Sequence, residues 1–242
     1  MYKFFVEDNQ IVENKIKIIG NDWKHISNVL RMKIGEEILV TNKKTSETYK
    51  CSIKNINKDE VECVIIEEKI ESTELSIKVD LYQGIPKSDK MEAIIQKSVE
   101  LGVNTIFPVN MKNCIAKIKD ENKKQERWQK ISESAAKQSK RNIIPSIEKS
   151  VNIDFICNNI KNYDLVIIAY ENEENITIKD ILKENKIEKI AIVVGPEGGL
   201  TEKEVDKLIN SGAKVATLGK RILRTETAPI TMLSMIMYEY DL

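Results

Sequence analysis

Two glycine- and charge-rich stretches in the C-terminal third carry the residue types that could form a ligand site. The first, GPEGGLTEKEV (195–205), follows an apolar run and precedes a helical pattern. Its glycines permit positive φ and close approach of a ligand. The spacing is neither a P-loop nor G-x-G-x-x-G, and Glu197 at its centre would repel a polyphosphate. The stretch therefore favours a neutral or cationic ligand, and a tight turn without any ligand is the alternative.

The second stretch, LGKRILRTETA (218–228), places Arg221, Arg224 and Glu226 in one short turn before an apolar helix. Arginines that are buried cost free energy unless they are paired. We expect this mixture to mark a site for a charged or polar substrate. The alternative is that Arg224 and Glu226 only pair with each other.

Composition excludes several classes of protein. Of the 242 residues, 38 are Lys or Arg and 38 are Asp or Glu, so the bulk charge does not indicate nucleic acid. None of the four cysteines forms a C-x-x-C pair and His25 is the one histidine, so no metal site is expected. The longest apolar run, 165–170, is too short to span a bilayer. The N-terminal residues MYKFFVEDNQ show no basic-then-apolar signal-peptide pattern. We expect a cytoplasmic protein with reduced thiols and no membrane partner.

Short β-rich runs dominate residues 1–70 and predict a small barrel. Only 22–32 reads as a helix there, with Asp22 as a plausible N-cap, and 71–76 reads as a linker. From 77 onward strands alternate with helices, which predicts an α/β domain with a mostly parallel sheet. Strands are expected over 77–85, 104–110, 164–170, 189–195 and 214–219, and helices over 88–102, 123–141, 178–186, 201–212 and 230–240.

The ligand of an open α/β sheet lies beyond the carboxyl ends of the strands. Three strand ends are chemically distinctive, and they begin after residues 168, 194 and 218. Thr201 and Glu204 fit a capping box for the helix that follows the glycine stretch. The helix over 230–240 is apolar almost all round, which suits either a core helix or a subunit interface.

These stretches together resemble the 16S ribosomal RNA uridine N3-methyltransferases, the RsmE family of the SPOUT class. Three further segments resemble that family in the same order along the chain: HISNVLRMKIGEE (25–37), KSDKMEAIIQKSVELGVNTIFPV (87–109) and RWQKISESAAKQSKRNIIP (127–145). Each motif alone is modest, but five in register are specific. Lys220 departs from the pattern, because many members carry Pro there.

The resemblance implies a SPOUT methyltransferase domain over 77–242 with a trefoil knot, and a PUA-like RNA-binding β-barrel over 1–70. It also implies a homodimer that uses S-adenosyl-L-methionine. The substrate would be 16S rRNA, in the small ribosomal subunit or as naked RNA, and the product 3-methyluridine in the decoding region. A positive sulfonium would explain a carboxylate in the glycine turn. By analogy, the cofactor would contact Ala169, Tyr170, Val194, Gly195, Pro196, Glu197, Gly198, Gly199, Leu218, Gly219, Ile222 and Leu223.

Among candidate catalytic residues, Arg224 would face the uridine or its phosphate. Glu226 or Glu197 could accept the N3 proton or anchor an arginine, and helix capping is the other reading for Glu226. Between 112 and 141, ten Lys or Arg oppose four Asp or Glu, and Trp128 interrupts them. The run suits phosphate contacts or a solvated helix face, and Trp128 is more typical of a core. The RNA-binding candidates are His25, Arg31, Lys137 and Arg141.

Three other functions stay open at this level. One is a SPOUT methyltransferase acting on a ribose 2′-hydroxyl or on transfer RNA. Another is a non-catalytic RNA-binding factor that keeps the cleft, and the third is an enzyme whose glycine turn binds a nucleotide phosphate. The modified nucleoside and the bound ligand distinguish these functions from uridine N3 methylation.

Overall fold

The computed structural model describes residues 1–68, 70–116, 118–182 and 187–241. By their contacts the residues form two compact units. The N-terminal unit comprises 1–74 together with 136–144, and the C-terminal unit comprises 75–135 and 145–242. Lys117 and the expected helix end at 183–186 lie outside the described residues.

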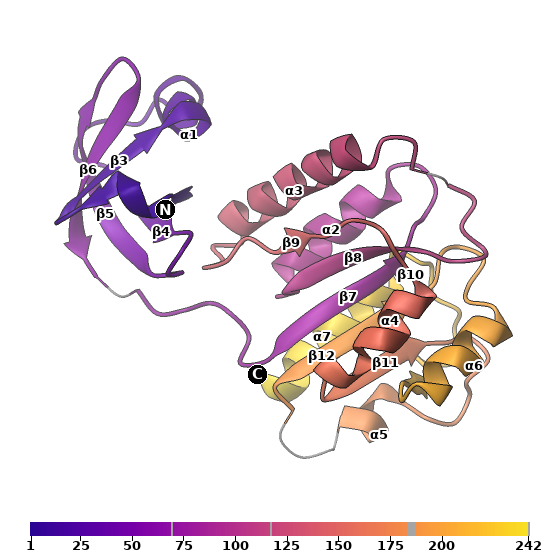
Figure 1. Ribbon diagram of the computed structural model, residues 1–242. Coiled ribbons are helices and arrows are strands. Elements are labelled where there is room, and N and C mark those ends of the chain that lie inside the picture. The colour runs from indigo at the N-terminus through magenta and orange to yellow at the C-terminus, as the bar shows by residue number, and fades with distance from the viewer. Residues whose placement is uncertain (69, 117, 183–186, 242) are drawn as a thin grey trace. The chain divides into compact units, whose positions relative to one another are not determined.

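The N-terminal unit is built on a six-stranded sheet in the order β1-β4-β5-β6-β3-β2 (Figure 1). All of its neighbouring strands are antiparallel except β1 and β4. Alternate apolar side chains such as Ile16, Ile18 and Ile38 are buried in its core, which confirms the predicted strands. The strands are β1 (Lys3–Val6), β2 (Ile11–Val12), β3 (Lys15–Ile19), β4 (Glu37–Asn42), β5 (Thr48–Ile56) and β6 (Glu60–Glu67).

The helix of this unit starts earlier than the sequence predicts. A short 3₁₀ turn, Asp8–Gln10, comes first, and helix α1 (Gly20–Lys24) then runs directly into a π-helical turn, His25–Val29. Ile19 occupies the N-cap position, so the prediction that Asp22 caps the helix is wrong. The Asp22 carboxylate instead accepts a hydrogen bond from Lys137 Nζ at 2.7 Å. Gly20, at φ +67°, permits the turn from strand to helix.

The segment 136–144 is anchored to the N-terminal unit by buried polar contacts. The Arg141 guanidinium forms an ion pair with Glu74, and the Glu74 carboxylate also accepts from the Asn142 amide at 2.7 Å. Arg141 is only 3% exposed. Its burial argues against the direct RNA contact predicted for it, because its donors already bind a carboxylate inside the unit.

Lys3 makes the stability of this unit depend on pH. Its Nζ donates to Lys140 O at 3.0 Å and to Asn142 Oδ1 at 3.2 Å. Burial, partly offset by the charge of Glu74, lowers the pKa of Lys3 from 10.5 to about 8. The unfolded chain therefore binds more protons between those values, so the free energy of unfolding rises with pH across this interval.

We expect the Lys3 contribution to raise the free energy of unfolding by about 2 kcal/mol from pH 8 to pH 10.5. One pKa unit is worth about 1.4 kcal/mol, but the group is only half titrated at either end of this interval, and solvent near the ammonium reduces the effect further. Urea unfolding at several pH values measures it. Lys3→Met is the control, because it removes the titrating group and keeps a long side chain. Equal pH slopes for Lys3→Met and wild type would contradict the assignment.

The C-terminal unit is a parallel sheet in the order β10-β8-β7-β12-β11-β13, with β9 paired to β8 (Figure 1). Ile190 of β12 pairs with Val79 of β7, far away in the sequence. The parallel α/β prediction is confirmed. The strands are β7 (Lys78–Gly84), β8 (Thr105–Asn110), β9 (Ser146–Ile147), β10 (Val151–Asn152), β11 (Leu165–Ala169), β12 (Lys189–Val194) and β13 (Lys214–Ala216).

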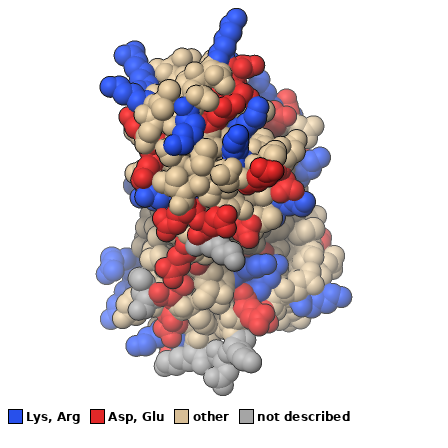
Figure 2. Space-filling model, turned by 90° about the vertical axis from the view of Figure 1, so that its left-hand side faces the viewer, with Lys and Arg blue, Asp and Glu red and all other residues tan. Residues whose placement is uncertain are grey.

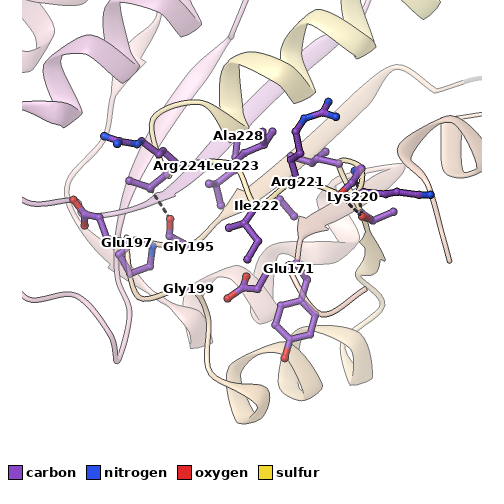
Figure 3. Close-up of a pocket in the computed structure, with 18 of the residues that line it drawn as sticks. Glu171, Gly195, Glu197, Gly199, Lys220, Arg221, Ile222, Leu223, Arg224 and Ala228 are labelled. Carbon is purple, nitrogen blue, oxygen red and sulfur yellow. Dashed lines mark hydrogen bonds between the residues drawn. The ribbon is translucent and has the colours of Figure 1, made fainter. Parts of the chain in front are cut away.

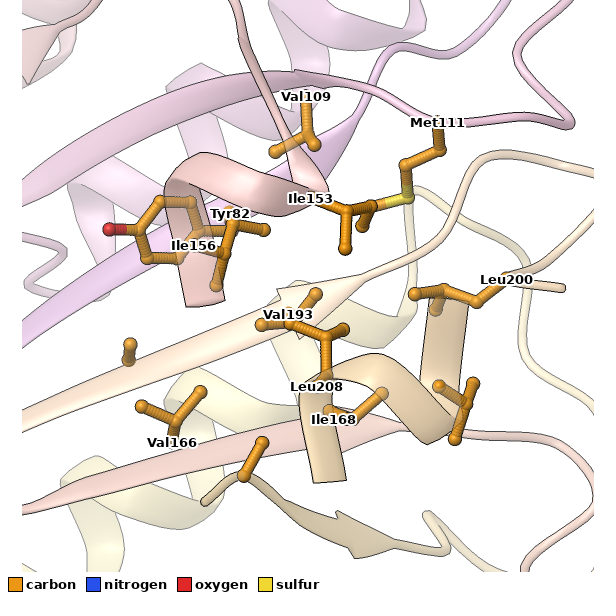
Figure 4. Packing of buried hydrophobic residues seen from close by; sticks show 13 residues of the cluster. Tyr82, Val109, Met111, Ile153, Ile156, Val166, Ile168, Val193, Leu200 and Leu208 are labelled. Carbon is orange, nitrogen blue, oxygen red and sulfur yellow. The ribbon is translucent and has the colours of Figure 1, made fainter. Parts of the chain in front are cut away.

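Helices cover both faces of this sheet. Ala191 and Val193 of β12 pack in one core cluster with residues of α4 and α6 (Figure 4). The alternate residues Ile190 and Ile192 are fully buried as well, and α7 contacts β7, β12 and α2. Both faces of the central strands are therefore apolar, as buried parallel sheets require. The helices are α2 (Lys90–Glu100), α3 (Glu121–Gln138), α4 (Ile153–Asn159), α5 (Ile178–Leu182), α6 (Glu202–Asn210) and α7 (Ala228–Tyr240), with a 3₁₀ turn at Ile160–Asn162.

Most predicted elements are found, and the differences have local causes. The capping box of Thr201 and Glu204 is present, and Trp128 is buried as expected of a core residue. Helix α4 was not predicted, and its cap is the Asn152 side chain, which accepts from the Phe155 amide. Helix α3 ends at Gln138, before a turn with Lys140 at φ +60°. The trefoil knot stays a prediction.

The surface charge is mixed (Figure 2), and the helices are too short or too polar to span a membrane within the described residues. On the face shown in Figure 2, Lys and Arg are interspersed with Asp and Glu, in keeping with a formal net charge of zero. Among the described residues, no helix combines the length and the apolar character that crossing a membrane would require.

Candidate functional site

A pocket of about 430 Å³ opens where β11, β12 and β13 end (Figure 3). That size lies within the range of small-molecule sites. The three strand ends singled out in the sequence meet there, as expected for an open parallel sheet. The pocket is lined by Lys90, Ala169, Tyr170, Glu171, Val194, Gly195, Pro196, Glu197, Gly199, Thr217, Leu218, Gly219, Lys220, Arg221, Ile222, Leu223, Arg224, Thr225 and Ala228.

Every predicted cofactor contact lines this pocket except Gly198. A Cβ on Gly198 would approach the Cβ of Asn113 at 3.0 Å, and Asn113 Nδ2 donates to Gly198 O at 2.8 Å. Gly198 does not line the pocket, and a side chain there would face Asn113, so its contact with the cofactor stays a prediction. Gly199 lines the pocket and has φ +66°.

Gly195 and Gly199 make the turn compact for two different reasons. A Cβ on Gly195 would lie 2.9 Å from the carbonyl carbon of Gly199 and from the amide nitrogen of Leu200. These are backbone atoms, which cannot move aside without changing the turn. A Cβ on Gly199 would meet the Glu171 carboxylate. Glu171 is a pocket residue that was not predicted from the sequence, although it directly follows Ala169 and Tyr170.

Buried hydrogen bonds join the glycine turn to the loop over 217–227. Thr225 Oγ1 donates to Gly195 O at 2.7 Å. Gln83 Nε2 donates to Thr225 Oγ1 at 3.0 Å and to Gly84 O at 3.0 Å. Gln83 is fully buried at the end of β7. These bonds hold the two loops in one register at the pocket wall.

Lys90, at the start of α2, joins the two carboxylates of the site. Its Nζ lies 3.0 Å from Glu197 Oε1 and 3.2 Å from Glu226 Oε2. The Lys87 amide donates to Glu197 at 3.1 Å. The hydrogen bonds with Glu197 and Glu226 raise the pKa of Lys90. Burial raises the pKa of Glu197, but hydrogen bonds from backbone amides and from Lys90 outweigh burial, and the pKa is lowered.

Lys90 offers a direct reason why a carboxylate is found in the glycine turn. Glu197 already has a cationic partner within the chain, because Lys90 forms an ion pair with it. Lys90 was not among the predicted site residues, although it follows the carboxyl end of β7, at the same edge of the sheet as the other three loops. The rule that ligands bind at the carboxyl ends of parallel strands could have indicated Lys90 as a site residue.

The arginines of the second loop are exposed. The Arg224 side chain is 82% exposed and its Nη1 lies 4.0 Å from Glu226 Oε1. Arg221 is exposed too, so burial imposes no free-energy cost on either side chain. Ile222 is 86% exposed and lines the pocket as an apolar group open to solvent. Arg224 lies at the pocket, as predicted for a residue that faces substrate, whereas the Glu226 side chain turns to Lys90.

The other RNA-binding candidates belong to the N-terminal unit. His25 begins the π-helical turn and Arg31 lies two residues beyond its end; both are exposed, and Arg31 has φ 51°. Their contact with RNA stays a prediction. Lys137 is bonded to Asp22, as described above. No set of three or more His, Cys, Asp or Glu that could hold a metal ion occurs in the part of the chain that the structure describes.

Comparison with known proteins assigns a class to each unit. Residues 73–237 match the family model described as RNA methyltransferase domain, and residues 18–66 match the RNA methyltransferase PUA domain. The fold and the pocket are therefore those of an RNA methyltransferase with a PUA domain. The SPOUT and PUA-like interpretation of the sequence is confirmed.

Full-length relatives narrow the class further. The ribosomal RNA small subunit methyltransferase E of Bacillus subtilis is 38% identical, with 100% of this chain and 98% of the relative covered. The enzyme of the same name from Mesomycoplasma hyopneumoniae is 37% identical, with 97% of this chain and 98% of the relative covered. The crystal structure of the Neisseria gonorrhoeae enzyme bound to S-adenosyl methionine is 32% identical, with a TM-score of 0.89 and coverage of 99% and 98%. The chain belongs to the ribosomal RNA small subunit methyltransferase E family.

Proposed function

We propose that this protein transfers a methyl group from S-adenosyl-L-methionine to N3 of a uridine in the decoding region of 16S rRNA. The observation that carries the proposal is the pocket at the ends of three parallel strands, with a compact glycine turn on one side and Arg224 on the other. Full-length similarity to small-subunit rRNA methyltransferases supports the substrate class. We place the reaction in the cytoplasm, where ribosomal subunits are assembled.

The residues of the pocket fit this cofactor. Leu218 and Leu223 line it with apolar surface suited to an adenine ring, and Ile222 adds an exposed apolar group. The glycine turn offers backbone groups at close range because Gly195 and Gly199 have no side chain. The Glu171 carboxylate lies beside Gly199 and matches the positive charge of a sulfonium or an amino group. When bound, the cofactor supplies an electrophilic methyl group.

The reaction forms a bond from uridine N3 to the methyl carbon as the sulfur–carbon bond breaks, and the N3 proton passes to solvent water. The Arg224 guanidinium can orient the uracil and balance the negative charge that develops on its imide. Glu197 is a poor candidate for the base, because hydrogen bonds lower its pKa and hold it to Lys90. Glu226 is likewise held by Lys90. Both carboxylates serve to position the two loops.

Labelled S-adenosylmethionine tests the proposal. We expect methyl incorporation into unmethylated small subunits or naked 16S RNA, with 3-methyluridine as the product identified by mass. The comparison of the two substrates shows whether the protein requires the assembled small subunit or also methylates naked RNA. A different methylated nucleoside would show that the methyl group is transferred to another atom than uridine N3. Absence of both incorporation and cofactor binding would overturn the proposal.

We further propose that the protein is a knotted homodimer and that His25 and Arg31 contact RNA. Helix α7 supports a subunit interface, because Tyr238 and Met235 are exposed on an otherwise apolar helix. Sedimentation equilibrium would test the dimer, and a monomer at all concentrations would contradict it.

A further inference from the structure

A second concave surface of about 920 Å³ lies in the C-terminal unit, apart from the cofactor pocket. The loop after β7 and the first part of α3 form its walls. We call it the α3 groove. Its lining residues are Ile85, Pro86, Ser88, Asp89, Met91, Ala116, Ile118, Lys119, Asp120, Lys123, Lys124, Glu126, Arg127, Trp128, Lys130, Ile131 and Ser134.

The α3 groove combines apolar side chains with cationic ones. Among the described residues, Lys119, Lys123 and Lys130 form no ion pair, and Lys124 Nζ lies 5.8 Å from the centre of the Trp128 ring. Arg127 is paired with Glu92 at 2.7 Å. The five cations outnumber three acids, which are Asp89, Asp120 and Glu126. The groove therefore has an excess of positive charge that the protein itself does not neutralise.

Trp128 brings an unpaired donor to the groove. The residue is 4% exposed, and its Nε1 has no hydrogen-bond partner within the described part of the chain. A buried donor without an acceptor costs about 1–3 kcal/mol. A ligand with acceptor atoms, such as the carbonyl groups of nucleobases, could satisfy that donor after a small adjustment of the groove.

The α3 groove and the cofactor pocket share one wall. Lys90 lines the pocket, while its sequence neighbours Asp89 and Met91 line the groove. The two cavities therefore lie on opposite sides of the short segment that begins α2. A strand whose target nucleotide enters the pocket mouth could place adjoining nucleotides in the groove.

We propose that the α3 groove binds a single-stranded stretch of the substrate RNA next to the target uridine. This inference rests on the proposed function. Apolar surface beside unpaired lysines is the combination used for single strands, where bases contact the protein surface and phosphates meet cations. Duplex RNA would present mainly phosphates and ribose hydroxyls, and would leave the partly exposed Ile118 and Ile131 without a partner.

Charge reversal at three groove lysines tests the inference. The triple variant Lys119→Glu, Lys123→Glu and Lys130→Glu should raise KM for RNA at least about tenfold near 100 mM salt. Each lost phosphate contact lowers the salt slope of log K by about 0.7 for single strands, so the slope should fall by about 2. The Kd for S-adenosylmethionine should not change, because these lysines do not line its pocket.

A matched control separates the groove from general electrostatics. Lys161→Glu, Lys179→Glu and Lys203→Glu change the net charge equally at exposed positions elsewhere in the same unit. If the wild type methylates RNA and both triple variants show the same KM and salt slope, the inference is wrong. If the wild type methylates no RNA, the proposed function itself has failed.

Crosslinking provides a second measurement that does not depend on substitution. RNA that carries 4-thiouridine beside the target position is irradiated with the full-length protein, and the crosslinked peptide is identified by mass. A peptide from 85–91 or 118–131 supports the inference. Crosslinks confined to other peptides overturn it.

Discussion

A Gly195→Val variant is expected to bind S-adenosylmethionine at least about 100-fold more weakly than the wild type. The reason is steric, since even a Cβ at this position would lie 2.9 Å from backbone atoms of Gly199 and Leu200. The turn must open to accept the larger side chain, and its amides and carbonyls then leave the pocket wall. A change of about 100-fold corresponds to about 2.7 kcal/mol of binding free energy.

The turn is also tied to the second loop, which increases the expected effect. Gly195 O accepts from Thr225 Oγ1, so a displaced residue 195 would pull on the loop that carries Arg224. Calorimetric titration of the folded variant measures the affinity. Retention of wild-type affinity would show that the ligand does not depend on this turn.

Gly20→Ala is the control for backbone strain. Gly20 has φ +67°, a Cβ added there would meet no atom within 4 Å, and the residue lies in the N-terminal unit. The substitution should lower the free energy of unfolding by about 1 kcal/mol and leave cofactor affinity unchanged. Loss of affinity in this variant as well would mean that instability, not the turn, explains the result for Gly195.

Local signals in the sequence predicted most of the secondary structure. Apolar runs located β11 and β12, because both faces of these strands are covered and polar residues would cost free energy there. The capping box of Thr201 and Glu204 located the start of α6. The edge rule for parallel sheets brought the three functional loops together correctly, because it depends on strand direction and not on exact contacts.

What could not be predicted depends on which strands are neighbours. Lys90 meets Glu197 because β7 lies beside β12, and the residues of these two strands do not indicate that the strands are neighbours. The same limit applies to 136–144, which begins in the last turn of α3 but joins the N-terminal unit through Arg141 and Glu74. The exposure of Arg224 could not be predicted, because a short charged loop does not reveal which side chains the fold covers.

The expected result for Lys90→Met is a fall in kcat/KM of about 100-fold with little loss of fold. Methionine keeps the length of the side chain but removes the ammonium that pairs with Glu197 and Glu226. The two carboxylates then face each other without a cation, and their repulsion separates the glycine turn from the loop of Arg224. The loss falls on positioning of the substrate.

Two comparisons distinguish this positioning role from general stabilisation. Lys90→Arg should recover much of the activity, since a guanidinium can bridge the same two carboxylates. Lys97→Met, on the same helix, removes an exposed lysine paired with Glu100 at 2.9 Å and should leave kcat/KM within about twofold, as surface pairs contribute little.

The pH dependence of kcat/KM on the acid side distinguishes positioning by Lys90 from a purely structural role. Hydrogen bonding from Lys90 helps to lower the pKa of Glu197, so the paired, ionised arrangement persists as the pH falls through the ordinary carboxyl range. In Lys90→Met, Glu197 should take up its proton at a higher pH, which removes the repulsion between the two carboxylates, so the deficit in kcat/KM relative to the wild type should shrink as the pH falls through that range. A kcat/KM equal to that of the wild type, or a deficit that does not depend on pH, would show that the bridge seen between the two loops does not position the reacting groups.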